Sequence, residues 1–477
     1  MVFSNTLLAG SSAQGGSVHS IDQSIRFNND DDAYMSRTQD TADSKRKLTF
    51  SWWMKIGSST GTERCIISAG ASSRFMVRFN TSDKLTFRLT NGTTEKTMTT
   101  DMVFRDNSAW YHCVWSPDCT GGISSDFSKF YVNGARVTMT GTQPSADTDF
   151  AGYGDGSTMA ISSLAHSLSV QEFDGYLAEM VLIDGTALDP SSFGEYNSSN
   201  IWIPKDVSGL TFGTNGFHID GRDASDLGDD ESGNGNDFTT SGLATHDQMA
   251  DSPTNNHAVM NIIDSRTTAN WTASNGNLDI YWQGNSYPNP LFSTLSMPAT
   301  GKWYFEIEFD TDGSGNVLTN QNMRIGLMRE DINAAYVEAN ASTDLTTSST
   351  SPEIIVVLGN AANSCQLKGM GCNIYNVGGS ISAGDRINFA REGANLWIGK
   401  NGTYYNSGNP ATGSNPTLSN LQLEGYRANM HWSTGNTSAN CIVKAYFGAG
   451  KSVGSGTGFN NTVPSGFLAL NTTNLGS

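Results

Sequence analysis

The feature that most constrains the fold is a succession of short segments in which apolar and polar residues alternate. In residues 48–56 (LTFSWWMKI), a period of two places Phe50, Trp52 and Met54 on one face of a strand. Comparable segments follow, separated by Gly, Ser, Asn and Asp: CIISAG, RFMVRFN, KLTFRLT, WYHCVW and KFYVNGARVTM. Asn-Gly pairs at 91–92, 133–134 and 401–402 supply the positive φ angles of a type I′ turn, so each predicts a hairpin. We therefore expect an all-β chain of antiparallel strands.

The length of 477 residues exceeds what one hydrophobic core usually supports. The strand-like segments fall into two groups, and we expect two tandem antiparallel β-sandwiches at residues 21–205 and 257–450. Residues 206–256 are rich in Asp, Gly, Ser and Asn, which predicts an exposed acidic connector. The small, polar residues 1–20 are expected to form an arm or anchor. Residues 451–477 are expected to be a tail that packs back on the second sandwich.

Helices are expected to be short and few. Asp189 followed by Pro190 is typical of a helix start, with Asp as cap and Pro at the first position. Residues 330–341 predict one further helix, with Ala335 and Tyr336 on its apolar face.

The charge balance argues against nucleic acid and anionic membranes as partners. The net charge is -18, from 28 basic and 46 acidic side chains, and no cluster of Lys and Arg is present. Strong negative charge helps a protein displayed in many copies to stay dispersed. No run approaches the roughly 18 apolar residues of a membrane span. The N-terminal sequence lacks the basic region of a signal peptide, so we expect synthesis in the cytoplasm without membrane insertion.

The six cysteines do not have the spacing of a C-x-x-C metal site, and we expect free thiols buried in strands. No cofactor is expected, with calcium as the alternative. Calcium is bound by loop carboxylates and carbonyls, and Asp155 and Asp174 lie in suitable loops. An ordinary solvated acidic loop is the favoured interpretation.

Glu306, Glu308 and Asp310 alternate along one strand and therefore share one sheet face. Concanavalin-like glycosidases carry a similar acidic ladder, in which one carboxylate is the nucleophile and another the acid. A solvated strand face is the favoured interpretation here, and the seven histidines are dispersed. We therefore expect a protein that is not an enzyme.

Aromatic residues on loops provide the candidate binding chemistry. Sugar rings stack their C–H faces on Tyr and Trp while polar neighbours hold the hydroxyls. Tyr404 and Tyr405 follow a predicted hairpin tip, and Tyr153 lies in the loop sequence AGYGDG, so these three are the candidate ligand-binding residues. Packing of the same tyrosines against a neighbouring subunit is an equally good alternative.

Two family resemblances cover about four-fifths of the chain. The first domain resembles the laminin-G/concanavalin A-like jelly rolls, through FSWWMKI, FRDNSAWYHCVW, FYVNG, FDGYLAEMVLIDGTALDPSSFGEYN and IWIPK. The second domain is similar to SPRY domains, through GKWYFEIEFD, the IGL of residues 325–327, GDRINFARE and LWIGKNGTYYNSGNPATGSNP. Its closing AYFGAG departs from the apolar-Asn-Phe-Gly-Gln ending usual in that family.

This pairing of domains resembles virion proteins of marine and cyanobacterial bacteriophages. The resemblance implies a non-enzymatic structural protein on the virion exterior, which we expect to be a tail fibre or tail-associated adhesin. Such a protein would bind host surface glycans or proteins as a homo-oligomer, with three copies expected by analogy with phage fibres, and would attach to other virion proteins through its N-terminal segment. The alternatives are a capsid decoration or head-fibre protein and a polysaccharide depolymerase, which would need an acidic pair in a groove.

Overall fold

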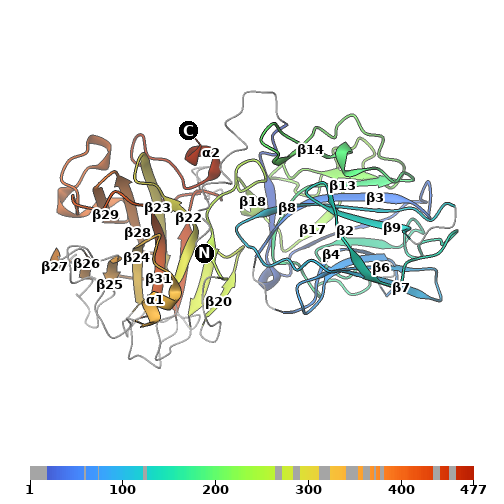
Figure 1. Cartoon of the computed structure of the whole chain (residues 1–477), viewed down its shortest axis with the longest axis horizontal. Helices are drawn as coiled ribbons and strands as arrows, with labels where there is room; N and C mark the ends of the chain where they lie inside the picture. Colours follow the sequence, from blue (N-terminus) through green and yellow to red (C-terminus); the bar gives the residue numbers. More distant parts are fainter. Residues whose placement is uncertain are drawn as a thin grey trace. The chain divides into compact units, whose positions relative to one another are not determined.

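The computed structural model describes residues 19–57, 61–72, 75–121, 126–263, 271–282, 290–310, 323–339, 353–357, 366–369, 372–376, 381–432, 441–450 and 458–476. These residues belong to two compact units, whose strands run from blue to green and from yellow to red in Figure 1. The first unit ends at Asn256 and also takes in Ser274–Gly276, while the second contains His257–Ala273 and the chain from Asn277 onward. Both units are all-β with short helices only, which confirms the predicted fold class.

The first unit is built from two antiparallel sheets, each of eight strands among the described residues. One sheet has the order β10 (Ala135–Arg136), β9 (Ser128–Val132), β8 (Trp110–Pro117), β3 (Leu48–Ile56), β13 (Gly175–Asp184), β1 (Ser24–Phe27), β18 (Gln248–Met249), with β16 (Phe217–Ile219) also paired to β13. The other has the order β11 (Met139–Gly141), β7 (Glu95–Thr100), β6 (Leu85–Thr90), β5 (Phe75–Phe79), β4 (Arg64–Ala69), β12 (Thr158–Ile161), β2 (Tyr34–Thr38), β17 (Thr239–Ser241). A hairpin of β14 (Gly194–Tyr196) and β15 (Trp202–Pro204) and the short helices η2 (Asn29–Asp31), η3 (Pro190–Ser192) and η4 (Thr245–Asp247) complete it.

The core of the first unit lies between these two sheets. Trp115 of β8 packs against Phe75 of β5, with ring centroids 5.1 Å apart, and Phe50 stacks on Trp52 within β3. Phe50, Trp52 and Met54 all face this core, as the period-two pattern predicts. The predicted buried free thiols are confirmed for Cys65, Cys113, Cys119 and Cys441, whereas Cys365 and the side chain of Cys372 lie outside what the structure describes.

Residues 206–256 do not form the exposed connector that the sequence suggested. This segment contributes β16, β17 and β18 to the two sheets of the first unit, and the unit ends only at Asn256. The composition misled because Asp and Asn also serve as hydrogen-bond acceptors for backbone N–H groups in tight turns. The corrected boundary adds this segment to the first sandwich.

The predicted turns form with one difference in type. Asn133 (φ 48°) and Gly134 (φ 77°) join β9 to β10, and Asn401 (φ 50°) and Gly402 (φ 78°) join β29 (Asn395–Lys400) to β30 (Thr403–Tyr404), which confirms both two-residue turns. The hairpin at 91–92 has a four-residue loop instead, because the Asn91 side chain accepts hydrogen bonds from the N–H groups two and three residues later. Asp189 caps η3 as predicted.

The second unit also has two antiparallel sheets, each of seven strands among the described residues. One has the order β19 (Met260–Asn261), β22 (Leu291–Met297), β31 (Tyr426–Trp432), β24 (Met323–Arg329), β25 (Glu353–Val357), β26 (Gln366–Gly369), β27 (Cys372–Asn376). The other has the order β20 (Trp271–Ser274), β21 (Asp279–Trp282), β32 (Cys441–Tyr446), β23 (Lys302–Phe309), β28 (Arg386–Glu392), β29 (Asn395–Lys400), β30 (Thr403–Tyr404). Its helices are α1 (Ala334–Ala339), η5 (Tyr405–Ser407), η6 (Pro410–Thr412) and α2 (Thr472–Leu475).

Short segments cover the outer faces of the second unit's sheets. Helix α1 packs Ala334 and Val337 against Met328 of β24, so the predicted helix is present but its face is wrong, since Tyr336 is 43% exposed. The tail residues Phe459 and Phe467 pack on the sheet containing β23 and β29. The start of that tail, residues 451–457, lies outside the described residues, as do residues 1–18 of the expected arm.

Candidate functional site

The three tyrosines proposed for ligand binding have different surroundings. Tyr153 is fully buried in the core of the first unit, and its hydroxyl donates a hydrogen bond of 2.9 Å to Asp184 Oδ1. The glycines on either side (Gly152 and Gly154) both have positive φ angles, which lets the loop turn the ring inward. Tyr153 is therefore a structural residue, and its assignment to ligand binding is corrected.

Tyr404 and Tyr405 are both half-buried rather than displayed at a hairpin tip. Tyr404 packs against the cluster that contains Trp397 and Phe459, and its hydroxyl is buried. Burial, with the charge of Glu306 as a second cause, raises the pKa of the Tyr404 hydroxyl. Tyr404 therefore packs on the sheet with its hydroxyl buried, and Tyr405 is the better of the two for contact with a ligand.

The two calcium candidates differ in exposure and in the contacts they make. Asp155 is exposed, and its carboxylate accepts hydrogen bonds of 3.1 Å from the backbone N–H groups of Gly152 and Ser157. Asp174 is buried, and its backbone carbonyl accepts a hydrogen bond of 3.0 Å from Gly57. Within the described ranges, no group of three or more His, Cys, Asp or Glu side chains is placed to hold a metal ion.

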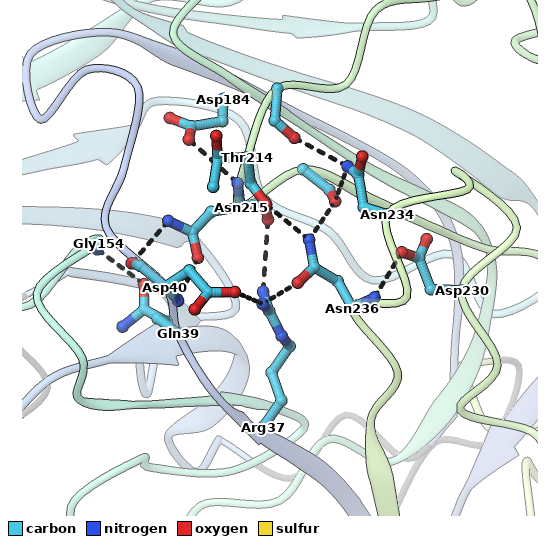
Figure 2. A network of polar contacts seen from close by, with 12 residues as sticks. Arg37, Gln39, Asp40, Gly154, Asp184, Thr214, Asn215, Asp230, Asn234 and Asn236 are labelled. Atoms are coloured by element: carbon cyan, nitrogen blue, oxygen red, sulfur yellow. Dashed lines mark hydrogen bonds and ion pairs between the residues drawn. The ribbon is translucent and has the colours of Figure 1, made fainter.

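Residues 206–256, the acidic segment of the first unit, are held by the polar network drawn in Figure 2. Asn215 exchanges two hydrogen bonds with the backbone of Asp40, at 2.8 and 2.7 Å. Asn236 donates to the carbonyls of Thr214 and Gly216 at 2.9 and 2.8 Å and accepts from Arg37. Because these amides bond backbone groups of neighbouring turns, the network positions the segment on the sandwich.

In the second unit, the acidic ladder of Glu306, Glu308 and Asp310 is bonded to other residues of the same unit. Glu306 is fully buried and accepts hydrogen bonds from the Tyr304 hydroxyl (2.6 Å) and Arg386 Nη1 (3.0 Å). It also accepts from the backbone N–H groups of Asn460 and Asn461, at 3.2 and 3.1 Å, and so ties the C-terminal segment to β23.

Glu308 and Asp310 each pair with a cation on the same face. Arg386 Nε lies 2.6 Å from Glu308 Oε2, and its guanidinium lies over the Tyr446 ring at 3.8 Å. Lys444 Nζ lies 2.7 Å from Asp310 Oδ2. A glycosidase needs one carboxylate kept as a general acid and another as a nucleophile or base. The shared Arg386 holds both glutamates as acceptors, which favours the structural interpretation of the ladder.

A serine–histidine pair lies in the first unit, with the wrong proton arrangement for nucleophilic catalysis. His112 Nε2 lies 2.9 Å from Ser51 Oγ, and Trp202 Nε1 lies 2.9 Å from His112 Nδ1. An indole N–H can only donate, so Nδ1 is the acceptor and the imidazole proton lies on Nε2, facing the serine. Burial lowers the pKa of His112 to about 3. His112 therefore cannot take the proton of Ser51, and the pair serves packing.

Above His112 lies an aromatic surface that the sequence analysis missed. We call Tyr196 and Trp202, on the β14–β15 hairpin, the hairpin aromatic face; Tyr196 is 50% exposed and Trp202 is partly buried. Their rings meet edge to face with centroids 4.9 Å apart, and the Tyr196 hydroxyl donates to the Asn133 carbonyl at 2.8 Å. The indole rests on Gly134, where any Cβ would collide with it. This arrangement presents an anchored tyrosine ring to solvent.

No helix among the described residues is long and apolar enough to cross a membrane. A comparison with curated proteins found no match. Residues 28–191 match the family model described as the concanavalin A-like lectin/glucanases superfamily.

Solved structures similar to this chain include the three that follow. The mouse laminin alpha1 chain domains LG4-5 are 8% identical, over 96% of this chain and 90% of that chain, with a TM-score of 0.30. The native heptameric SAP-like pentraxin of Limulus polyphemus is 17% identical, over 36% and 79%, with a TM-score of 0.28. The SPRY domain of human HERC1 is 14% identical, over 37% and 91%, with a TM-score of 0.25. These TM-scores are low. The two-sheet fold of the second unit is shown by its own strand pairing. The first sandwich is thus similar, over residues 28–191, to the concanavalin A-like lectin/glucanases superfamily.

Proposed function

We propose that this protein is a non-enzymatic bacteriophage virion component, a tail fibre or tail-associated adhesin on the particle's exterior. In this proposal it binds host surface glycans or proteins by contact alone, as a homo-oligomer of three copies attached to the virion through its N-terminal segment. The proposal of a phage origin is supported by the resemblance of the two paired domains, in sequence, to virion proteins of bacteriophages.

The observation that carries the binding proposal is the hairpin aromatic face on the sandwich that resembles lectins. A tyrosine ring held at its hydroxyl and against an indole loses little conformational freedom when a sugar stacks on it. The carboxylates and the histidine that could have served hydrolysis are bonded internally, which supports contact rather than reaction.

The direct test is adsorption of the purified, fluorescently labelled protein to host bacteria and to an array of bacterial surface glycans. Tyr196→Ala is expected to lower binding by at least about tenfold, the equivalent of about 1.4 kcal/mol. Tyr196→Phe loses the hydrogen bond of the hydroxyl but keeps the ring and its contact with Trp202, and is expected to bind between wild type and Tyr196→Ala. Tyr336→Ala removes a similarly exposed tyrosine from α1 and serves as the matched control.

Equal binding by folded wild-type and Tyr196→Ala proteins would contradict the assignment of this face. The virion context is tested separately, by locating the chain in a map of the phage particle. Density at the tail supports the adhesin, and density on the shell would replace it with a decoration role.

A further inference from the structure

A lysine in the first unit is buried in a way that is unusual for this residue type. Lys55 belongs to β3, and its side chain is completely inaccessible to solvent. Lysine is almost never fully buried without a partner, because removing the ammonium from water is costly. The residues around Lys55 therefore indicate what its amine is placed to do.

Lys55 Nζ contacts a carboxylate and a primary amide. Nζ lies 2.7 Å from Asp251 Oδ2 and 2.8 Å from Asn256 Oδ1. The other oxygen of Asp251 accepts a hydrogen bond of 3.0 Å from Trp110 Nε1. Asn256 Nδ2 donates to the carbonyl of Ser108 at 2.7 Å, which turns the amide carbonyl toward the lysine.

Burial makes the amine of Lys55 easier to deprotonate than an exposed lysine. Burial lowers the pKa of Lys55, against the opposing effects of the charge and the hydrogen bond of Asp251. The Tyr176 ring lies 5.7 Å from Nζ, and Asp251 is itself inaccessible to solvent. An amine that gives its proton to a neighbouring carboxylate becomes a nucleophile, and exclusion of water suppresses hydrolysis of the amide it attacks.

We propose that Lys55 and Asn256 form an intramolecular isopeptide bond after folding, with Asp251 as the proton carrier. The proton of the ammonium passes to Asp251, and the freed lone pair of Nζ attacks Cγ of Asn256. The new Nζ–Cγ bond forms and the Cγ–Nδ2 bond breaks, while Asp251 delivers this first proton to the leaving nitrogen and then carries a second proton to it from Nζ. Nitrogen leaves as ammonium, Asp251 returns to its carboxylate form, and no oxidant or reductant is involved.

The position of this bond gives it a mechanical consequence. Lys55 lies in β3, which pairs with both β8 and β13 in the middle of its sheet. Asn256 is the last residue of the first unit before the chain enters the second unit at His257. Tension transmitted along the chain from residue 257 would then load a covalent bond to β3 instead of peeling away β18 and the segment that follows it.

The test is the intact mass of the full-length protein, purified under denaturing conditions after folding. Wild-type protein is expected to be lighter than its sequence mass by one ammonia, and protease digestion is expected to release the peptides containing residues 55 and 256 joined together. Lys55→Met and Asn256→Ala are expected to have their full sequence masses. Lys205→Met removes a partly exposed lysine and is expected to keep the loss of ammonia.

The joined peptides separate this proposal from a succinimide at an Asn-Gly pair, which also loses ammonia. Full sequence mass in folded wild-type protein would overturn the proposal, as would an ammonia loss that persists in Lys55→Met. Loss of one water with the link on Asp251 would overturn the assignment to Asn256. Because the wild-type peptides alone decide the question, the result stands even where a variant fails to fold.

Discussion

Replacing Glu306 by alanine tests most sharply whether the acidic ladder of the second unit is structural. The substitution removes the acceptor of the Tyr304 hydroxyl, of one nitrogen of Arg386 and of two backbone N–H groups in the C-terminal segment. Each buried group left without a partner costs about 1–3 kcal/mol, and breaking a buried ion pair from one side costs about 3–5 kcal/mol. Because these contributions overlap, we expect the second unit to lose about 3–5 kcal/mol.

Asp310→Ala is the matched control, since Asp310 follows Glu306 on the same face but pairs with Lys444 in a partly exposed position. A pair of that kind contributes about 0–1 kcal/mol. Urea unfolding of the full-length variants, with limited proteolysis to identify which unit opens, measures the difference. Equal and small losses for the two variants would refute the reasoning, because Glu306 would then not hold the C-terminal segment.

The other predictions concern three further regions. Asn236→Ala removes the hydrogen bonds that the side-chain amide donates to two carbonyls, and is expected to lower the stability of the first unit by about 2–3 kcal/mol. Urea unfolding measures this loss, and limited digestion is expected to show that residues 206–256 become accessible to protease. Although burial lowers it, the hydrogen bond and charge of Glu179 raise the pKa of His218 overall, so their contribution is complete below about pH 6.5 and is lost as pH rises through the raised pKa. Glu179→Gln should therefore remove a fall in the unfolding free energy as the pH rises above about 6.5, and an unchanged slope would exclude Glu179 as its source. Tyr404→Ala should lower the unfolding free energy by about 2–3 kcal/mol because its ring packs against a buried cluster, whereas Tyr405→Ala should lower it by less than about 1 kcal/mol. Thermal unfolding and host adsorption of both variants test this, and a larger loss of stability in Tyr405→Ala would contradict the structural role given to Tyr404.

The sequence predicted the strands well because period-two burial is a local property. Phe50 and Trp52 face the core as their spacing requires, and Asn133 with Gly134 forms the turn that only such residues adopt easily. The acidic segment was misjudged because Asp230 bonds three backbone N–H groups, and composition alone does not separate such a turn from a solvated loop.

Side-chain sites that depend on distant segments were the part that sequence reasoning could not reach. Trp202 contacts His112 and Gly134 only because the β14–β15 hairpin folds over β8 and β9, so no spacing of residues in the sequence predicts that contact. Tyr153 was misplaced for the same reason, since its partner Asp184 is on another strand. Local pattern gave the strands, and long-range packing decided which aromatic residues remained accessible.

The most direct test of contact without reaction measures binding and bond cleavage in one sample. Purified protein is incubated with host cells and with their isolated surface polysaccharide, and bound protein and newly released reducing ends are followed together over time. We predict saturable binding that depends on Tyr196, with no increase in reducing ends. Reducing ends that accumulate with wild-type protein but not with Glu306→Gln would contradict the account and make the acidic ladder a catalytic site.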